Sequence, residues 1–226
     1  MKIDINKGFV RLDGFEATDL SVVNSARVSF GQKKDFLDQS DVGLINFLVK
    51  NRHGTPFEHN FFRFHVKAPI FVAREWFRHR IGSFNEFSMR YSVPELEFYV
   101  PDVENFRTQT GKPGSYTFEP MSDENGLVGY LQRQIEEVNK FSEETYEQLL
   151  AAGVAKELAR IVLPVNTYTE FYWSINARSL MNFISLRSAP EAMFEIREFS
   201  EAIEYIFSSI MPVTYQSFID NNKIAV

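Results

Sequence analysis

The residues best suited to chemistry are cations gathered in one short stretch of the chain. Between residues 70 and 91 the basic side chains are Arg74, Arg78, His79, Arg80 and Arg90. Glu75 and Glu86 are the only acids in that stretch, although the whole chain carries a net charge of −6. The planar guanidinium fork meets phosphate oxygens in pairs, so this cluster predicts a site for a phosphorylated ligand. The alternative is a set of cations that stabilise the carbonyl end of a helix.

Glycine motifs offer no other way to hold phosphate. The eleven glycines form neither G-x-G-x-x-G nor G-x-x-x-x-G-K-[ST]. Rossmann and P-loop sites are therefore excluded, and phosphate binding falls to the arginines. Three consecutive cations at residues 78–80 would point in different directions around a helix end, 100° apart, so they could contact a ligand from several sides.

The segment after the cluster also carries polar groups at regular spacing. If it is extended, Glu86, Ser88 and Arg90 lie on one side, because side chains alternate along a strand. Phe87 and Met89 then face the other way. An acceptor, a hydroxyl and a guanidinium in one row suit a ligand with a hydrogen-bonding ring edge and a phosphate. The alternative is a polar edge strand without a ligand.

Composition limits the function further. The chain has 226 residues, 44% of them apolar and 24% charged, as in a folded globular protein. It has no cysteine, which excludes thiolate nucleophiles, Cys-based zinc sites and disulfides. Its acidic balance argues against a protein that coats nucleic acid. The sequence has neither a signal-peptide pattern nor an apolar run long enough to span a membrane, so we expect a cytoplasmic protein.

The elements that must position these residues are predicted to form one α+β domain over residues 1–226. We expect a mainly antiparallel sheet packed with several helices, including long amphipathic ones. Strands are expected at residues 3–12, 61–66 and 167–174. Helices are expected at about 19–27, 41–50, 69–80, 127–152, 155–163, 176–187 and 190–205 or beyond. Asp19 is predicted to cap the first helix, and Ser40 and Asp41 the second. Residues 101–129, which include Lys112-Pro113-Gly114, are expected to form a loop.

Several of these segments match one known pattern. Arg78-His79-Arg80 is followed after seven residues by Ser88, which resembles the R-H-R-x7-S signature of the flavin-dependent thymidylate synthases. The similarity to that family extends over most of the chain. It includes ARVSF at 26–30, HGTPFEH at 53–59, FRFHVKAPIFVAREWFRHR at 62–80, ELARIVLP at 157–164 and NTYTEFYWSINARSLMNFISLR at 166–187.

The resemblance implies an activity and its cofactors. Members of the family methylate dUMP to dTMP, with methylenetetrahydrofolate as carbon donor, FAD as hydride carrier and NADPH as reductant. The other known thymidylate synthase chemistry attacks the uracil ring with a Cys thiolate, which this chain does not have. The family forms homotetramers with shared active sites, so the resemblance also implies a homotetramer.

Site residues follow from the resemblance position by position. FAD would be held by His53, Thr55, Glu58, Arg78, His79, Arg80, Glu86, Asn176, Arg178 and Asn182. The dUMP contacts would be Glu75, Arg78, Glu86, Phe87, Ser88, Met89, Arg90, Arg160 and Arg187. Arg187 matches the arginine beside the uracil, where a fixed cation favours the ionised ring, so it is the expected catalytic residue.

Helical spacing adds an expectation about the segment at 176–187. Asn176 and Arg187 nearly superimpose on a helical wheel, whereas Arg178 and Asn182 lie about 200° and 240° away. One helix could then serve two ligands or two subunits. A departure from the family is Glu75, where members often carry Gln. This carboxylate either repels the phosphate of dUMP or pairs with a neighbouring arginine.

Two other functions compete with this interpretation. The histidines at 53, 59 and 65 suggest a metal hydrolase, but their spacing lacks H-E-x-x-H and no carboxylate cluster completes a metal shell, so we expect no metal. A non-catalytic protein that binds a nucleotide or flavin, or that assembles subunits, would use the same arginines without turnover. The aromatic residues Phe171, Tyr172, Trp173 and Phe183 are expected in the core or in a subunit interface.

Overall fold

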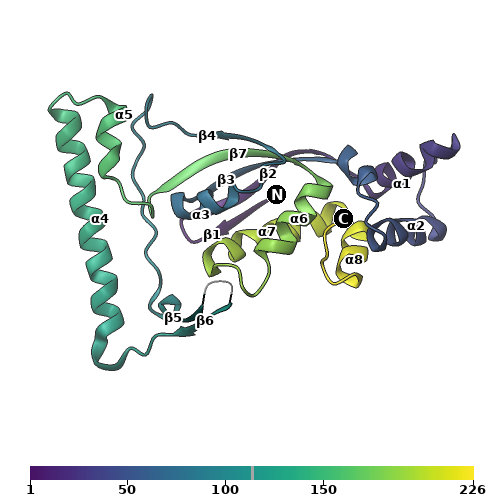
Figure 1. Ribbon diagram of the computed structural model, residues 1–226. Coiled ribbons are helices and arrows are strands. Elements are labelled where there is room, and N and C mark those ends of the chain that lie inside the picture. The colour runs from purple at the N-terminus through teal and green to yellow at the C-terminus, as the bar shows by residue number, and fades with distance from the viewer. Residues whose placement is uncertain (113–114) are drawn as a thin grey trace. The chain divides into compact units, whose positions relative to one another are not determined.

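The computed structural model describes residues 1–112 and 115–226, and these form an α+β fold (Figure 1). The chain divides into two compact units. Unit 1 contains residues 1–68, 72–86 and 170–226, and unit 2 contains residues 69–71 and 87–169. The α+β class with a mainly antiparallel sheet is confirmed. That the two units make one domain stays a prediction.

Unit 1 is built on a five-stranded sheet in the order β1-β2-β3-β7-β4. The strands are β1 (Lys2–Ile5), β2 (Gly8–Glu16), β3 (Phe61–Pro69), β4 (Ser83–Glu86) and β7 (Tyr168–Asn176). The pairings β1–β2, β2–β3 and β4–β7 are antiparallel. The single strand expected at 3–12 is wrong. Asn6 adopts a left-handed backbone with φ of 52°, and this turn folds the segment into a hairpin.

The core lies on one face of this sheet and is largely aromatic. Phe62 and Phe64 alternate with exposed positions along β3, as the period of two requires. Trp76 and Trp173 are fully buried, with ring centroids 5.2 Å apart. Phe183 contacts both indoles, with centroids 4.8 and 5.0 Å away. Burying one such side chain contributes about 1.5–3 kcal/mol, so several of the 23 phenylalanines of the chain stabilise this core.

Six helices complete unit 1. They are α1 (Asp19–Arg27), α2 (Gln39–Lys50), α3 (Ile70–Trp76), α6 (Ala177–Arg187), α7 (Phe194–Ile210) and α8 (Pro212–Asp220). The predicted helix at 69–80 ends earlier, at Trp76. The last helix is interrupted at Met211, where φ is −127°, and Pro212 starts α8. Figure 1 shows α8 beside α1 and α2.

The first two helices are capped one to three residues before the predicted caps. Thr18, not Asp19, accepts the hydrogen bond from the Ser21 N–H at the start of α1. Asp19 instead reaches α8, where its carboxylate accepts hydrogen bonds from the Thr214 N–H and hydroxyl at 2.8 and 2.6 Å. Asp38 caps α2, and Asp41 is the N3 residue of the same capping box.

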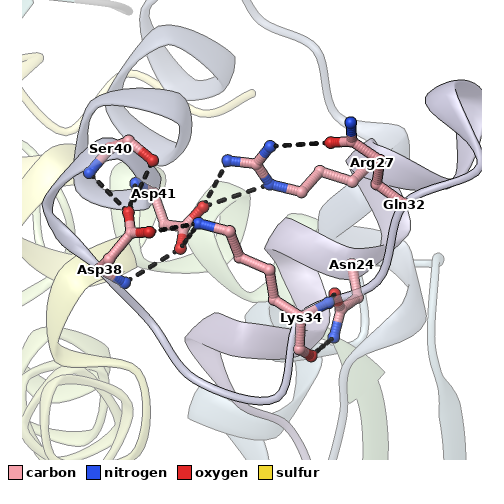
Figure 2. Close-up of polar contacts among 7 residues, drawn as sticks. All are labelled: Asn24, Arg27, Gln32, Lys34, Asp38, Ser40 and Asp41. Carbon is pink, nitrogen blue, oxygen red and sulfur yellow. Dashed lines mark hydrogen bonds and ion pairs between the residues drawn. The ribbon is translucent and has the colours of Figure 1, made fainter.

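Asp41 is also the centre of an ion-pair network between α1 and α2 (Figure 2). Its side chain is fully buried. One oxygen accepts a hydrogen bond from Arg27 Nη2 at 2.6 Å, and the other lies 2.8 Å from Lys34 Nζ. Burial raises the pKa of the Asp41 carboxyl, but its hydrogen bonds with Lys34, the Asp38 backbone and Arg27 outweigh this effect, so the pKa is below its ordinary value.

Unit 2 contains the long helix α4 (Leu127–Ala151), the short helix α5 (Lys156–Ala159) and a two-stranded sheet. Gly153, with φ of 84°, follows the end of α4 as predicted. The loop expected at 101–129 is wrong in part, because β5 (Arg107–Lys112) and β6 (Ser115–Pro120) form an antiparallel ladder there. Pro113 and Gly114 of the predicted loop lie outside the described residues. Among the residues that are described, no helix is both long and apolar enough to cross a membrane.

Candidate active site

A cavity of about 610 Å³ in unit 1 collects most of the predicted cations. Its lining includes four guanidinium groups, a single carboxylate and two amide side chains. These are Arg78, Arg80, Arg178, Arg187, Glu58, Asn176 and Asn182. Such an excess of positive charge around a hollow suits an anionic ligand that carries phosphate.

The Arg-His-Arg cluster enters this cavity from the end of α3. The predicted last helical turn is wrong, since the helix ends at Trp76 and residues 77–80 leave it. The Arg78 N–H still bonds the Glu75 carbonyl at 3.3 Å, and the His79 N–H bonds the Trp76 carbonyl at 3.0 Å. These bonds span three residues and tighten the end of the helix. Arg78, His79 and Arg80 then follow as a turn and an irregular segment before β4.

Helix α6 forms a second wall of the cavity. Asn176 caps it, because its Oδ1 accepts a hydrogen bond from the Ser179 N–H at 2.8 Å. Arg178 and Asn182 lie four residues apart on one face. Arg187, on a different face, also lines the same cavity. That one helix serves two ligands or two subunits stays a prediction.

Arg178 is held in place by partners from distant parts of unit 1. Its Nη1 lies 2.5 Å from Glu58 Oε1, and its Nε donates to the Val226 carbonyl at 3.0 Å. Both charged side chains of this pair are partly exposed, so the pair contributes only about 0–1 kcal/mol. Gly54 makes room for the guanidinium, because a Cβ there would lie 2.8 Å from Arg178 Cδ and Cζ.

Arg187 lies at the His79 end of the cavity and makes three hydrogen bonds. Its Nη1 donates to Glu75 Oε2 at 2.7 Å, and its Nη2 donates to the Glu75 carbonyl at 3.0 Å. Its Nε donates to His79 Nε2 at 3.0 Å. Of the two possibilities stated for Glu75, pairing with an arginine is therefore the one observed.

His79 is neutral at physiological pH. Burial lowers its pKa, and the positive charge of Arg187 lowers it further, to about 4. Because Nε2 faces an N–H donor, it must accept, and the ring proton belongs on Nδ1. The His79 ring also contacts Phe183, with centroids 4.9 Å apart. This contact anchors the imidazole to the aromatic core.

The cavity includes some predicted residues and leaves out others. As far as the described chain goes, His53, Thr55 and Glu86 are not part of its lining. Four further residues line the cavity and were not predicted, namely Ile81, Ser179, Leu186 and Val226. Leu186 follows Asn182 by one helical turn, so helical spacing could have identified it. No local signal points to Val226.

Three predicted dUMP residues meet in unit 2. Ser88 Oγ accepts a hydrogen bond from the Arg90 N–H at 3.4 Å. Arg90 Nε lies 3.4 Å from Glu157 Oε2, and Arg160 Nε donates to the Glu157 carbonyl at 3.3 Å. Lys156, which was not predicted, adds another cation, with its Nζ 3.2 Å from the Tyr91 carbonyl. Arg90 and Arg160 therefore both contact Glu157, while Ser88 and Lys156 contact the backbone of Arg90 and of Tyr91.

The expected row of Glu86, Ser88 and Arg90 along one extended strand is wrong. Strand β4 ends at Glu86, and residues 89–91 form a turn in which the Tyr91 N–H bonds the Ser88 carbonyl at 3.1 Å. Phe87 and Met89 therefore do not form an opposite face of that strand. Glu86 is the last residue of this segment in unit 1, and Phe87 is the first in unit 2.

The histidines outside the cluster do not form a metal site within the described ranges. There, no group of three or more His, Asp or Glu side chains is arranged to hold a metal ion. His65 lies in β3 and stacks on Tyr172, with centroids 4.7 Å apart and its Nε2 2.9 Å from Glu170 Oε2. His53 packs edge-on against Phe47.

Comparison with known proteins decides the family. A family model described as thymidylate synthase complementing protein matches residues 12–213. The flavin-dependent thymidylate synthase of Thermotoga neapolitana is 47% identical over 221 residues, which cover 97% of this chain and 94% of that protein. This chain belongs to the flavin-dependent thymidylate synthases. An enzyme of that name from Thermus thermophilus is 44% identical over 214 residues, covering 95% of this chain and 76% of its own.

Solved structures agree with membership of the flavin-dependent thymidylate synthases. The UMP/dUMP methylase PolB of Streptomyces cacaoi, bound with 5-Br UMP, is 39% identical and has a TM-score of 0.88, with 97% of each chain covered. The same protein bound with 5-Br dUMP has a TM-score of 0.87, with 97% of this chain and 98% of that one covered. The predicted family, fold class, enzyme activity and FAD cofactor are confirmed.

Proposed function

We propose that this protein converts dUMP to dTMP by reductive methylation, with methylenetetrahydrofolate as carbon donor, FAD as hydride carrier and NADPH as reductant. The observation that carries the proposal is the cavity in unit 1, where the guanidinium groups of Arg78, Arg80, Arg178 and Arg187 converge in a chain without cysteine. A thiolate route to thymidylate has no nucleophile here, whereas a flavin route needs none.

The residues around the cavity fit FAD. Arg78, Arg80 and Arg178 would hold its pyrophosphate, because guanidinium groups bind phosphate oxygens in pairs. Asn176 and Asn182 offer amide groups to ring edges. When bound, FAD supplies the hydride chemistry of the reaction. On the family resemblance, His53, Thr55, Glu58, His79 and Glu86 complete the cofactor site.

Arg187 would act on the uracil ring of dUMP. Its guanidinium carries a permanent charge, and a fixed cation beside a ring N–H lowers the pKa of that N–H. The ionised ring is the more nucleophilic form, so Arg187 would promote attack by uracil carbon without a covalent enzyme intermediate. His79 accepts the Arg187 Nε–H as a neutral imidazole and adds no competing charge.

The phosphate of dUMP would be held by Ser88, Arg90 and Arg160. Supporting this, Arg90 and Arg160 both contact Glu157 in unit 2, and the Ser88 hydroxyl accepts a hydrogen bond from the Arg90 N–H. The Arg90–Glu157 pair is exposed, contributes about 0–1 kcal/mol and can be exchanged for a phosphate. On the family resemblance, Arg78, Glu86, Phe87 and Met89 complete the dUMP contacts.

The larger organisation is proposed on the same grounds. Residues 1–226 would form one thymidylate synthase domain, since the family model spans parts of both units. Four copies would assemble with shared active sites, and the enzyme would work in the cytoplasm. These statements rest on the family resemblance and on the sequence.

The visible absorption spectrum of the purified protein tests the redox half of the proposal. We expect an oxidised flavin spectrum that bleaches anaerobically when NADPH is added. Adding dUMP and methylenetetrahydrofolate should then yield dTMP, measured by chromatography. A protein that takes up no FAD even in excess would contradict the cofactor site. One that binds FAD and dUMP without turnover would be the non-catalytic binding protein.

A further inference from the structure

Glu75 contacts Arg187 through two different groups of the same residue. The side-chain Oε2 accepts from Nη1 at 2.7 Å, and the backbone carbonyl accepts from Nη2 at 3.0 Å. The two residues are 112 positions apart in sequence and belong to α3 and α6. A guanidinium held at two of its nitrogen atoms by one partner cannot rotate freely in its plane.

His79 fixes the third nitrogen of the same guanidinium. Its Nε2 accepts the Arg187 Nε–H at 3.0 Å. Three of the five N–H groups of the Arg187 guanidinium therefore donate hydrogen bonds, one from each of its three nitrogen atoms. This clamp leaves Arg187 one well-defined orientation from which its other N–H groups can face a ligand.

Glu75 contacts the guanidinium without lining the cavity. Within the described part of the chain, the cavity is lined by Arg187 and His79 but not by Glu75. The side chain of Glu75 is partly exposed and that of Arg187 is mostly buried. A ligand in the cavity would therefore meet Arg187 directly and Glu75 only through it.

We propose that Glu75 is a positioning residue that holds the guanidinium of Arg187 in the orientation needed to act on the uracil ring. This inference rests on the proposed function, in which Arg187 contacts dUMP. It differs from the direct dUMP contact that the family resemblance assigned to position 75. Glu75 acts on the substrate through Arg187 alone.

The charge of Glu75 also acts on Arg187 directly. A substitution that removes the charge but keeps the acceptor distinguishes this electrostatic effect from positioning. A carboxylate 2.7 Å from the guanidinium offsets part of its positive field. Glu75→Gln keeps an oxygen acceptor for Nη1 but removes the negative charge, so the bound uracil should ionise at lower pH. The other charged side chains that line the cavity with Arg187 are Arg78, Arg80, Arg178 and Glu58. His79, beside Arg187, is neutral above about pH 4, because burial and Arg187 lower its pKa.

The experiment compares Glu75→Ala and Glu75→Gln with the wild-type enzyme and with Glu201→Ala, an exposed residue of α7 in the same unit. The readouts are FAD content, kcat and KM for dUMP, and the pH profile of kcat. We expect Glu75→Ala to lower kcat about 10- to 100-fold through misplacement of Arg187, with FAD content and KM changed less than about threefold. Glu75→Gln should keep kcat within about fivefold of the wild type and shift the pH profile to lower pH.

Three results would overturn the proposal. Glu75→Ala could keep the wild-type kcat, it could raise KM with kcat unchanged, as a direct dUMP contact would, or it could lose FAD and kcat together, as a folding defect would. If the wild-type enzyme makes no dTMP, the proposed function is wrong, and the role of Glu75 that rests on it is wrong as well. The Glu201→Ala variant should match the wild type in every readout.

Discussion

Arginine serves two purposes in this protein, and its contacts distinguish them. Arg187 is clamped by Glu75 and His79, with three hydrogen bonds of 2.7–3.0 Å. Arg178 is held by the partly exposed carboxylate of Glu58 and by the backbone oxygen of Val226. A rigid, mostly buried guanidinium suits a catalytic charge, whereas a loosely paired one suits exchange with a ligand phosphate.

Replacing each kind of arginine should therefore give different defects. Arg187→Ala is expected to abolish dTMP formation while FAD binding stays largely intact. Arg78→Ala should weaken FAD binding itself, because it removes a charge-assisted phosphate contact. Chromatography of the products measures dTMP yield, and flavin absorbance after gel filtration measures FAD binding. Normal turnover by Arg187→Ala would show that its role in ring ionisation is wrong.

Gly54 offers a more selective test of the cofactor site. In Gly54→Ala the new methyl group would overlap the guanidinium of Arg178, where a Cβ lies 2.8 Å from Cδ and Cζ. We expect FAD affinity to fall about tenfold, since one charged contact is displaced. Gly43→Ala is the control, because no atom lies within 4 Å of its added Cβ. Titration of the apoprotein with FAD measures the affinity of both variants, and equal FAD affinities of Gly54→Ala and Gly43→Ala would contradict the prediction.

The lowered pKa of His79 links the site to stability. Burial and Arg187 lower this pKa from 6.5 to about 4, so the folded protein binds fewer protons than the unfolded one between these values. Stability therefore rises with pH through this window and is lost on acidification. His79→Gln keeps an acceptor but cannot titrate, so its unfolding free energy should fall less between about pH 7 and about pH 5. Urea unfolding of the FAD-free proteins measures this, and parallel pH curves would contradict it.

At the scale of elements, the junction of α1 and α2 depends on Asp41. This buried carboxylate pairs with both Arg27 and Lys34 (Figure 2). Asp41→Asn should cost about 3 kcal/mol, because it removes the buried charge that pairs with Arg27 and leaves Lys34 paired with Asp38 alone. Asp38→Ala, which removes the exposed cap of the same helix, should cost only about 1 kcal/mol. Urea unfolding measures the free energy of unfolding of both variants. Equal losses of that free energy would show that the burial of Asp41 does not matter here.

The sequence predicts elements well where the pattern is local and strong. The helix at 176–187 and the long helix at 127–152 agree with α6 and α4 to within a residue or two. The helix at 69–80 was too long, because apolar spacing continues through Phe77 and Ile81 although β4 must begin at Ser83. The ladder β5–β6 was missed because both strands are almost fully exposed and β5 contains no apolar residue that could alternate with its polar ones.

The sequence also predicts those site residues that belong to a local motif and misses those that depend on long-range contacts. The Arg-His-Arg cluster and Arg178 and Asn182 were predicted by motif, and they line one cavity. The clamp on Arg187 had no local signal, because Glu75 and Arg187 are 112 residues apart and meet only when α3 and α6 pack. Long-range pairs of this kind depend on the tertiary fold rather than on spacing along the chain.

At the scale of the whole molecule, the single chain leaves large apolar side chains in water. Phe30 is 80% exposed and Phe36 is 83% exposed, and Val28 and Phe47 are also exposed. Burying such groups between copies is favourable, which is consistent with the proposed homotetramer. Light scattering should give a particle about four times the 26.3 kDa chain mass. A particle of the mass of one chain would contradict this.

The aromatic core has an optical consequence. The chain contains only two tryptophans, and both belong to one cluster in which Phe183 contacts Trp76, Trp173 and His79. His79 lines the cavity, so both indoles lie two ring contacts from the cofactor site. Indole emission overlaps flavin absorption, and energy transfer is efficient over so short a path. The intrinsic fluorescence of the unlabelled protein should therefore report cofactor occupancy directly and in real time.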